Sequence, residues 1–294
     1  MQITILGAGE IGSAIAHAIG NRAQVKIWDK NADKVPDQGT LISALHDADL
    51  VFLCIPSWML RSALHNIKPH LPTKTAVVAL TKGIERETCL FTDDLIAQEL
   101  PDRAYGILGG PMLAEEIMSD KTAGGILGSQ AAELHETIEQ LFNGSSISIE
   151  TTTDTRGVAV CGVLKNIYAV TLGICEGLAL GDNAKGMIVA QAVSEMQSLA
   201  KRMGAEPQTA FGRAGLGDLF ATGMSTHSRN HTVGVALANG GDGHLASEGL
   251  MSLPCVQKIL GADVQHYPLL AALVAISLTG DNPKRRFDEL FSIL

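Results

Sequence analysis

The chain has 294 residues, of which 46% are hydrophobic and 18% charged, and its 31 glycines follow no period of three. This composition excludes a disordered chain and a collagen, and the length is enough for two ordinary domains. The formal net charge of −9 argues against a nucleic-acid partner. An anionic small substrate remains open, because a few Lys and Arg side chains in one cleft set the local field.

The N-terminal sequence MQITILGAG enters a strand at once without a basic segment, so we expect no signal peptide. The apolar run Tyr267–Thr279 is shorter than the ~20 residues that cross a bilayer, which predicts no membrane insertion. The five cysteines are scattered and form no CxxC pair. We therefore expect reduced thiols packed as small apolar residues, and a cytoplasmic protein.

The first half of the chain alternates strand and helix patterns. Short apolar runs predict strands at Ile3–Ala8, Gln24–Trp28, Leu50–Ile55, Thr75–Leu80, Tyr105–Leu108, Gly124–Leu127 and Ser146–Thr152. Helical periods between them lie at Ile11–Asn21, Trp58–Ile67 and Gln130–Phe142. Continuous apolar strands separated by helices indicate a doubly wound parallel sheet that is covered on both faces.

After residue 152 the strand signal stops. Helical periods follow at Thr155–Leu180, Ala184–Met203, Pro207–Phe211, Thr232–Ala238 and Pro268–Leu278, with a loop at Asn239–Gly243. We predict an α/β domain over residues 1–152 and an all-α domain over residues 153–294. The absence of a Pro-rich or low-complexity linker favours two domains that share a cleft.

The sequence Gly7-Ala8-Gly9-Glu10-Ile11-Gly12 is a GxGxxG motif that follows a predicted strand and opens a helix. In this context the motif indicates a Rossmann-type dinucleotide-binding domain. Gly7 would allow the tight turn, Gly9 the approach of a pyrophosphate, and Gly12 close packing of helix on strand. The alternative is a glycine turn that binds nothing.

Asp29 closes the second predicted strand, where an acidic side chain usually accepts from the adenine ribose and favours NAD. Lys30 follows directly and could instead pair with the 2′-phosphate of NADP. The two residues therefore leave both cofactors open. Either charge could also be a solvated turn residue.

Two further motifs follow predicted strands, at the edge where open α/β sheets bind ligands. Lys82 lies in Thr81-Lys82-Gly83, where it could hold a phosphate or a carbonyl oxygen, and Gly110 lies in Gly109-Gly110-Pro111. A lone Lys at a strand end is otherwise a surface residue.

Lys165 and Asn166 lie within an apolar helical stretch. A buried Lys is costly unless it is paired, and its burial suits proton transfer. Asp218, in a glycine-spaced turn, would share a helix face with Thr222. The alternatives are a snorkelling Lys and a helix-capping Asp.

Ser228-Arg229-Asn230 lies in a polar stretch that we interpret as a loop. Arg is suited to bidentate recognition of a phosphate, and the neighbouring hydroxyl and amide add neutral hydrogen bonds. The alternative is a solvated loop Arg.

Taken together, these motifs resemble the bacterial NAD(P)-dependent glycerol-3-phosphate dehydrogenases over almost the whole chain. The matching motifs, in order, are the glycine loop, Lys82-Gly83, Gly110-Pro111 with Ala114-Glu115, Leu164-Lys165-Asn166, Gly181-Asp182-Asn183-Ala184-Lys185, Gly215-Leu216-Gly217-Asp218-Leu219 and Ser228-Arg229-Asn230. The later motifs are the specific ones, since other Rossmann-type dehydrogenases share only the first. This chain has Glu10 and Ile11 where that family usually has a small residue and an aromatic one.

The resemblance implies reversible hydride transfer between NAD(H) or NADP(H) and dihydroxyacetone phosphate, giving sn-glycerol 3-phosphate for phospholipid synthesis. It implies that Lys165 is the catalytic lysine, assisted by Asp218 and Lys82. The substrate-binding positions that it implies are Lys82, Gly110, Met112, Lys165, Asn166, Asp218, Ser228, Arg229 and Asn230. The cofactor-binding positions are Gly7, Gly9, Glu10, Ile11, Gly12, Asp29, Lys30, Lys82, Ala114, Arg229 and Glu248.

The predicted partner is thus a phosphorylated triose, with no metal, and a homodimer is left open. Two other interpretations remain. A related keto-acid reductase, such as a ketopantoate-reductase-like enzyme, would also use a helix Lys and Asn but would need no phosphate grip. A nucleotide-binding sensor without catalysis would be expected to lack the Lys.

Overall fold

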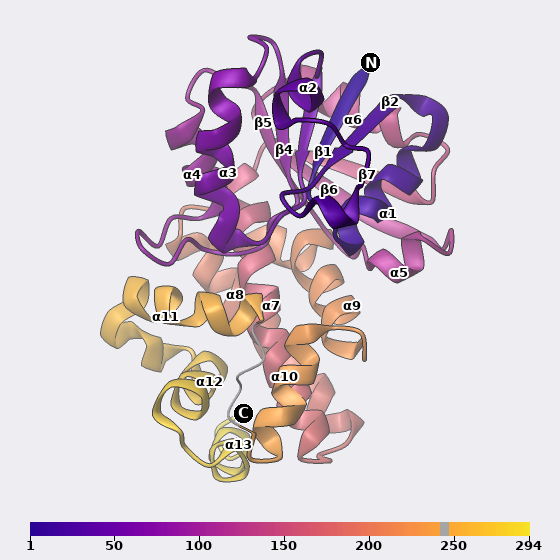
Figure 1. Cartoon of the computed structure of the whole chain (residues 1–294). Coiled ribbons are helices and arrows are strands. Elements are labelled where there is room, and N and C mark those ends of the chain that lie inside the picture. The colour runs from indigo at the N-terminus through magenta and orange to yellow at the C-terminus, as the bar shows by residue number, and fades with distance from the viewer. Residues whose placement is uncertain (242–246) are drawn as a thin grey trace. The chain divides into compact units, whose positions relative to one another are not determined.

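The computed structural model describes residues 1–241 and 247–294 (Figure 1). The chain folds as two compact units. The N-terminal unit comprises Met1–Glu85 and Leu90–Ala159, and the helical unit comprises Arg86–Cys89 and Val160–Leu294. The sequence places the boundary at residues 152 and 153, where the last strand ends, whereas the units divide within the following helix.

The N-terminal unit is built on one seven-stranded sheet with the order β2-β1-β3-β4-β5-β6-β7. Its strands are β1 (Gln2–Leu6), β2 (Gln24–Trp28), β3 (Leu50–Leu53), β4 (Ala76–Ala79), β5 (Tyr105–Gly109), β6 (Ala123–Ser129) and β7 (Ile147–Thr152). All seven predicted strands are present. The predicted parallel sheet has one exception, because β6 runs antiparallel to β5 and then pairs in parallel with β7.

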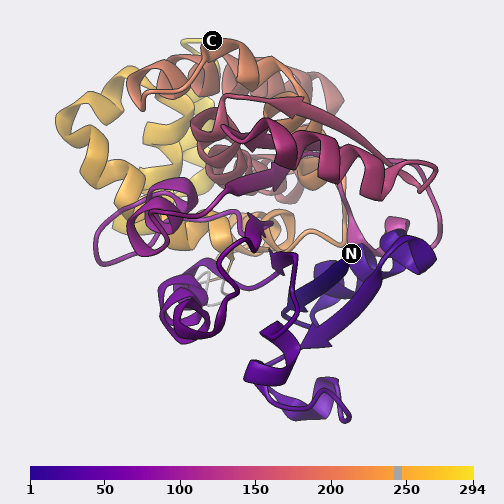
Figure 2. The same ribbon diagram turned by 90° about the horizontal axis from the view of Figure 1, so that it is seen from above.

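Helices cover both faces of this sheet (Figures 1 and 2). On one face, α1 (Glu10–Ile19) and α6 (Ala132–Phe142) pack their apolar sides onto the strands, in a cluster that includes Ile15, Phe52 and Ile138. The remaining helices of the unit are α2 (Leu41–Leu45), α3 (Leu60–Ile67), α4 (Thr92–Glu99) and α5 (Ala114–Ile117). Burial on both faces explains the continuous apolar runs of β3 and β4.

The helical unit contains no strand in its described residues, as the sequence predicts. Its helices are α7 (Thr155–Gly177, which begins in the N-terminal unit), α8 (Asp182–Arg202), α9 (Asp218–Met224), α10 (Arg229–Ala238), α11 (Glu248–Leu260), α12 (Pro268–Thr279) and α13 (Pro283–Phe291). A 3₁₀ segment at Pro207–Phe211 and a π-helical turn at Arg213–Gly217 precede α9. Of the predicted loop Asn239–Gly243, the last two residues lie outside the described residues.

By length and composition, helix α7 could cross a membrane, but the apolar stretch that meets these criteria is entirely buried inside the protein. It therefore has the character of a core helix. It packs closely against α10 through glycines, since a Cβ on Gly173 would lie 2.1 Å from the His231 carbonyl oxygen. A Cβ on Gly234 would lie 2.1 Å from the Val170 carbonyl oxygen. At both glycines the backbones of α7 and α10 are therefore in direct contact, with no space for a side chain.

The cysteines correct the expectation of fully reduced thiols. Cys89 and Cys255 form a disulfide within the helical unit, with their Cα atoms 5.3 Å apart. This spacing is normal for a bridge. The two cysteines are 166 residues apart in the sequence, so local spacing could not predict their pairing. Cys54, Cys161 and Cys175 form no disulfide and are buried, in agreement with the expectation of reduced, packed thiols.

Candidate active site

The glycine loop joins β1 to α1 at the carboxyl end of the parallel strands. Gly7 has φ +106°, and a Cβ there would lie 2.3 Å from the Cys54 carbonyl oxygen. A Cβ on Gly12 would lie 1.9 Å from the Gly7 carbonyl oxygen, so this position must stay bare for the helix to pack. A Cβ on Gly9 would meet nothing within 4 Å, so the backbone here borders open space.

The N-terminus of α1 is arranged to receive an anion. Gly9 is the N-cap residue and no side chain caps the helix. The first-turn N–H groups and the helix dipole therefore favour a phosphate at this point. Glu10 is exposed and Ile11 is partly buried against the core, which makes Ile11 a packing residue of the loop.

Asp29, just after β2, is held in place by several contacts. Its Oδ2 accepts a hydrogen bond from the Ala8 N–H at 2.8 Å and lies 3.4 Å from the Lys34 ammonium. Its Oδ1 accepts from the Asn31 N–H at 2.8 Å. Burial raises the pKa of Asp29, but hydrogen bonds from Asn31 and Ala8 outweigh it, and the net pKa is lowered. The sequence singles out Lys30 as the positive charge beside Asp29, whereas in the structure Asp29 forms an ion pair with Lys34.

Lys82 and Gly110 come together at the ends of β4 and β5. The Lys82 ammonium donates to the Gly110 carbonyl oxygen at 3.2 Å. Gly110 has φ +105°, and a Cβ there would lie 2.3 Å from the Gly124 carbonyl oxygen at the start of β6. Met112, two residues further on, is buried, and Ala114 begins α5. Lys82 is thus a partly buried strand-end residue tied to the glycine turn.

A buried ion pair joins α7 to α9 in the helical unit. Lys165 is only 5% exposed, which excludes the snorkelling interpretation. Its ammonium lies 3.0 Å from Asp218 Oδ1 and donates to Thr222 Oγ1 at 2.8 Å. The Thr222 hydroxyl in turn donates to Asp218 Oδ1 at 3.1 Å.

The local sequence explains this geometry. The π-helical turn at Arg213–Gly217 leads directly into α9, so Asp218 opens that helix and Thr222 follows one turn later on the same face. The Asp218 carboxylate therefore contacts both Lys165 and Thr222. An isolated ammonium would be very costly to bury, and this partner offsets the cost.

A second polar cluster surrounds the neighbouring Asn166. Asn230 Nδ2 donates to Asn166 Oδ1 at 2.9 Å, and the Gly249 N–H donates to Asn230 Oδ1 at 2.9 Å. Asn166 and Asn230 are both buried. The cluster joins α7, α10 and the first turn of α11. Gly249 was missed by the sequence analysis, although it directly follows the predicted nucleotide contact Glu248.

Ser228-Arg229-Asn230 corrects the prediction of a loop, because it forms the start of α10. Ser228 is the N-cap residue, and its side chain accepts from the His231 N–H. Arg229 is the first helical residue and is exposed. The sequence signal was present, since Ser is a preferred N-cap residue. A helix N-terminus beside an exposed Arg gives positive potential from two sources.

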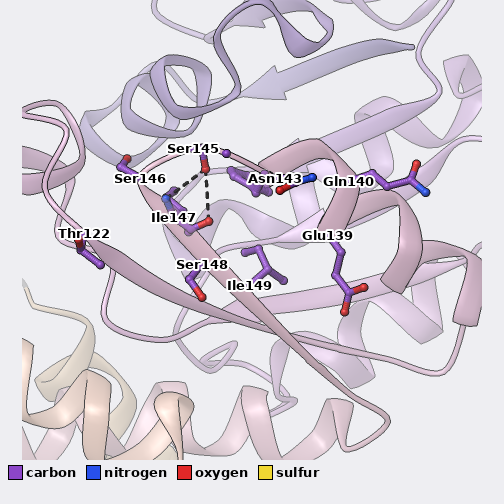
Figure 3. A pocket seen from close by; sticks show the side chains of 11 residues that line it. Thr122, Glu139, Gln140, Asn143, Ser145, Ser146, Ile147, Ser148 and Ile149 are labelled. Atoms are coloured by element: carbon purple, nitrogen blue, oxygen red, sulfur yellow. Dashed lines mark hydrogen bonds between the residues drawn. The ribbon is translucent and has the colours of Figure 1, made fainter.

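A cavity of about 630 Å³ lies on the N-terminal unit, at the edge strand β7 and the end of α6 (Figure 3). Its lining includes Glu139, Gln140, Asn143 and Ser148. None of the candidate site residues lines it. Among the residues that the structure describes, no cluster of His, Cys, Asp or Glu could hold a metal ion.

A glycine loop at the end of β1 and a buried Lys–Asp pair in a helical unit define a class: two-unit oxidoreductases that use a nicotinamide cofactor. The family model of the NAD-dependent glycerol-3-phosphate dehydrogenase N-terminus matches residues 33–135. The family model of the NAD-dependent glycerol-3-phosphate dehydrogenase C-terminus matches residues 154–288. The chain belongs to the NAD-dependent glycerol-3-phosphate dehydrogenase family.

Individual relatives support this family assignment. A glycerol-3-phosphate dehydrogenase [NAD(P)+] of Acinetobacter baumannii is 37% identical, covering 96% of this chain and 87% of the relative. The crystal structure of glycerol-3-phosphate dehydrogenase from Coxiella burnetii is 26% identical and superposes with a TM-score of 0.92, covering 99% of this chain and 98% of that one.

The class named as the alternative is related in fold alone. A PanE/ApbA family ketopantoate reductase from Ralstonia eutropha gives a TM-score of 0.59 at 16% identity, with 99% of each chain covered. The family match therefore favours the glycerol-3-phosphate interpretation.

Proposed function

We propose that this chain catalyses the reversible NAD(P)-dependent reduction of dihydroxyacetone phosphate to sn-glycerol 3-phosphate. The observation that carries the proposal is the buried cluster of Lys165, Asp218 and Thr222 in a chain of this family. A buried ion pair adds little to stability compared with an apolar core, so its presence points to chemistry.

The residues of the N-terminal unit fit a dinucleotide. The bare backbone at Gly9, the uncapped N-terminus of α1 and Asp29 after β2 offer groups for the pyrophosphate and the adenine ribose. When bound, the reduced nicotinamide supplies the hydride for the carbonyl carbon. We assign residues 1–152 to cofactor binding and residues 153–294 to substrate binding and catalysis.

The helical unit supplies the proton. The Lys165 ammonium donates a proton to the carbonyl oxygen as the alkoxide develops, and general acid catalysis of this kind contributes roughly 10²–10⁴-fold. Asp218 and Thr222 hold the ammonium in one orientation, so that little reorganisation is needed during the reaction.

The substrate phosphate is bound at the start of α10. Arg229 offers a bidentate contact, and the helix N-terminus adds the potential of its peptide groups. Binding energy from this remote group places the carbonyl for reaction. Lys82, Gly110, Met112, Asn166, Ser228 and Asn230 complete the proposed triose site, and Ala114, Arg229 and Glu248 the nucleotide contacts.

The test is oxidation of NADH and of NADPH, each with dihydroxyacetone phosphate and, separately, with ketopantoate. The proposal expects turnover with the phosphorylated triose and none with ketopantoate. Turnover of ketopantoate alone would favour the related reductase. Tight nucleotide binding without turnover of either substrate would favour a sensor. A cytoplasmic location and a homodimer are further parts of the proposal, tested by fractionation and by the mass of the protein in solution.

A further inference from the structure

We propose that Gly249 is a positioning residue of the active site. It allows the first turn of α11 to pack directly on the backbone of Asn166, the neighbour of Lys165. Asn230 holds this turn in place by hydrogen bonds. The inference rests on the proposed function, which assigns catalysis to Lys165 and nucleotide contact to Glu248. Gly249 itself touches neither ligand in this proposal.

The first turn of α11 lies against the backbone of α7, with no room for a side chain between them. A Cβ on Gly249 would lie 2.4 Å from the Asn166 carbonyl oxygen and 2.8 Å from its carbon. Both are below the distance that real Cβ atoms show, and a backbone carbonyl within a helix cannot swing aside. Any residue other than glycine must therefore move α11 away from the Lys165-Asn166 turn.

Asn230 fixes the direction of this contact. Its Oδ1 accepts from the Gly249 N–H and its Nδ2 donates to Asn166 Oδ1, both at 2.9 Å. One amide thus ties α11 to α7 through two buried hydrogen bonds. Breaking one end would leave a buried polar group without its partner, which is the costly outcome.

Two further donors of this turn are also occupied. The Leu250 N–H donates to Ser247 Oγ, and the Met251 N–H donates to the Ser247 carbonyl oxygen. The start of α11 is thereby capped from within the protein. The starts of α1 and α10 carry the proposed phosphate sites, whereas the start of α11 is a fixed element that orients Glu248.

Substitution of Gly249 by alanine tests the proposal, with Gly186→Ala as the matched control. Gly186 lies in α8, and a Cβ there would meet nothing within 4 Å. We expect Gly249→Ala to raise KM for the nicotinamide cofactor and lower kcat, together by on the order of tenfold to a hundredfold in kcat/KM, as misplacement of a site predicts. Gly186→Ala should keep wild-type constants. All measurements are made well below each variant's Tm.

Two variants of Asn230 keep the test decisive where Gly249→Ala does not fold. Asn230→Asp keeps an acceptor for the Gly249 N–H and loses the donor to Asn166, whereas Asn230→Ser is too short to reach both. We expect Asn230→Asp to retain more cofactor affinity than Asn230→Ser. We also expect faster amide hydrogen exchange in the first turn of α11 in Asn230→Ser.

A lower Tm with unchanged kcat and KM in Gly249→Ala would overturn the proposal, because it would show a structural role only. Equal cofactor affinity in Asn230→Asp and Asn230→Ser would also overturn it. If the wild type binds NADH but turns over no triose phosphate, the proposed function fails. Cofactor affinity and hydrogen exchange then still decide whether Gly249 positions α11.

Discussion

The two units differ in the chemical groups that they offer to a ligand. The N-terminal unit offers backbone: its key positions are Gly7, Gly9, Gly12 and Gly110, which have no side chain and border peptide groups or open space. The helical unit offers buried side chains, above all Lys165 with Asp218. One unit thus relies on the conformational freedom of glycine, and the other on charges that the fold must pay to bury.

The two kinds of site should therefore be sensitive to opposite kinds of substitution. Backbone sites depend on the absence of atoms, so added atoms should harm them. Buried charged sites depend on complete sets of partners, so removing one member should harm them.

Removal of the Lys165 ammonium should have the largest effect. We expect Lys165→Met to lower kcat by ~10²-fold or more while NADH binding is retained, because the proton donor is lost. Steady-state kinetics and NADH fluorescence titration check this. Lys201→Met, at an exposed position of α8, is the control and should keep wild-type kcat. Retention of most of kcat by Lys165→Met would refute the assignment.

The glycine loop offers a matched pair of added methyl groups. Gly7→Ala should destabilise the N-terminal unit by about 1–3 kcal/mol or more, because φ +106° and the Cys54 carbonyl oxygen both oppose a Cβ. Gly9→Ala should keep the wild-type Tm and weaken NADH binding, since its Cβ would occupy space that we assign to the pyrophosphate. Equal Tm losses in the two variants would contradict this reading of the loop.

Loss of the phosphate contact should be intermediate in size. We expect Arg229→Ala to cost ~1.5–3 kcal/mol in binding of dihydroxyacetone phosphate, seen as a raised KM. Dihydroxyacetone, which lacks the phosphate, should be affected far less. An unchanged KM for the phosphorylated triose would remove Arg229 from the site.

The pH dependence of stability should differ between the units. Burial raises the pKa of Asp93 to about 6, with Arg156 opposing and Asp94 adding to the shift. Its contribution to stability is greatest below its usual pKa of 3.8 and is lost as the pH rises through about 6. In the helical unit, burial lowers the pKa of His231, so its contribution is instead present above the usual value of 6.5 and is lost as the pH falls through the lowered pKa.

Asp93→Asn isolates the first of these effects. We expect the stability of this variant relative to wild type to improve by about 1–3 kcal/mol between pH 4 and pH 7. Urea unfolding at both pH values measures it. Asp94→Asn, at the more exposed partner of Arg156, is the control. A difference between Asp93→Asn and wild type that does not change with pH would show that Asp93 does not titrate in this range.

The sequence predicted the strands because a strand buried on both faces is a continuous apolar run. It could not predict the direction of β6, since a Gly-rich run such as AGGILGS has the same pattern in either direction. Helix α11 was missed because Pro254 lies inside it and a Pro usually ends a helical pattern.

The sequence predicted the residues of the site and the shared helix face of Asp218 and Thr222, but not the full set of contacts. Lys165 and Asp218 were both singled out, yet their 3.0 Å ion pair joins positions on different helices that no local period connects. Gly249 carries no local signal either, because its importance comes from the Asn166 carbonyl of a distant helix. Long-range partners of this kind follow from packing, which a single sequence does not display.

The choice between NADH and NADPH should show the smallest effect. Asp29 favours the ribose diol of NADH and repels a 2′-phosphate, but Lys34 lies 3.4 Å from it and the exposed Lys30 adds a second positive charge nearby. Solvent-screened charges of this kind are each worth only ~1 kcal/mol or less. We therefore expect both cofactors to be accepted, with kcat/KM values that differ by less than ~10³-fold.

Variants at Asp29 must respect its second role. Because its carboxylate also accepts from the Ala8 N–H, Asp29→Ser would disturb the glycine loop as well as the charge. Asp29→Asn keeps an acceptor and removes only the charge, so it should shift the ratio of kcat/KM towards NADPH, whereas Asp29→Ser should lower kcat/KM for both cofactors. Lys34→Met should shift the ratio the other way. A wild-type ratio beyond ~10³ would exceed what these side chains supply, since each 1.4 kcal/mol is tenfold, and would place the selecting residue elsewhere, with Glu10 and Arg229 the first to test.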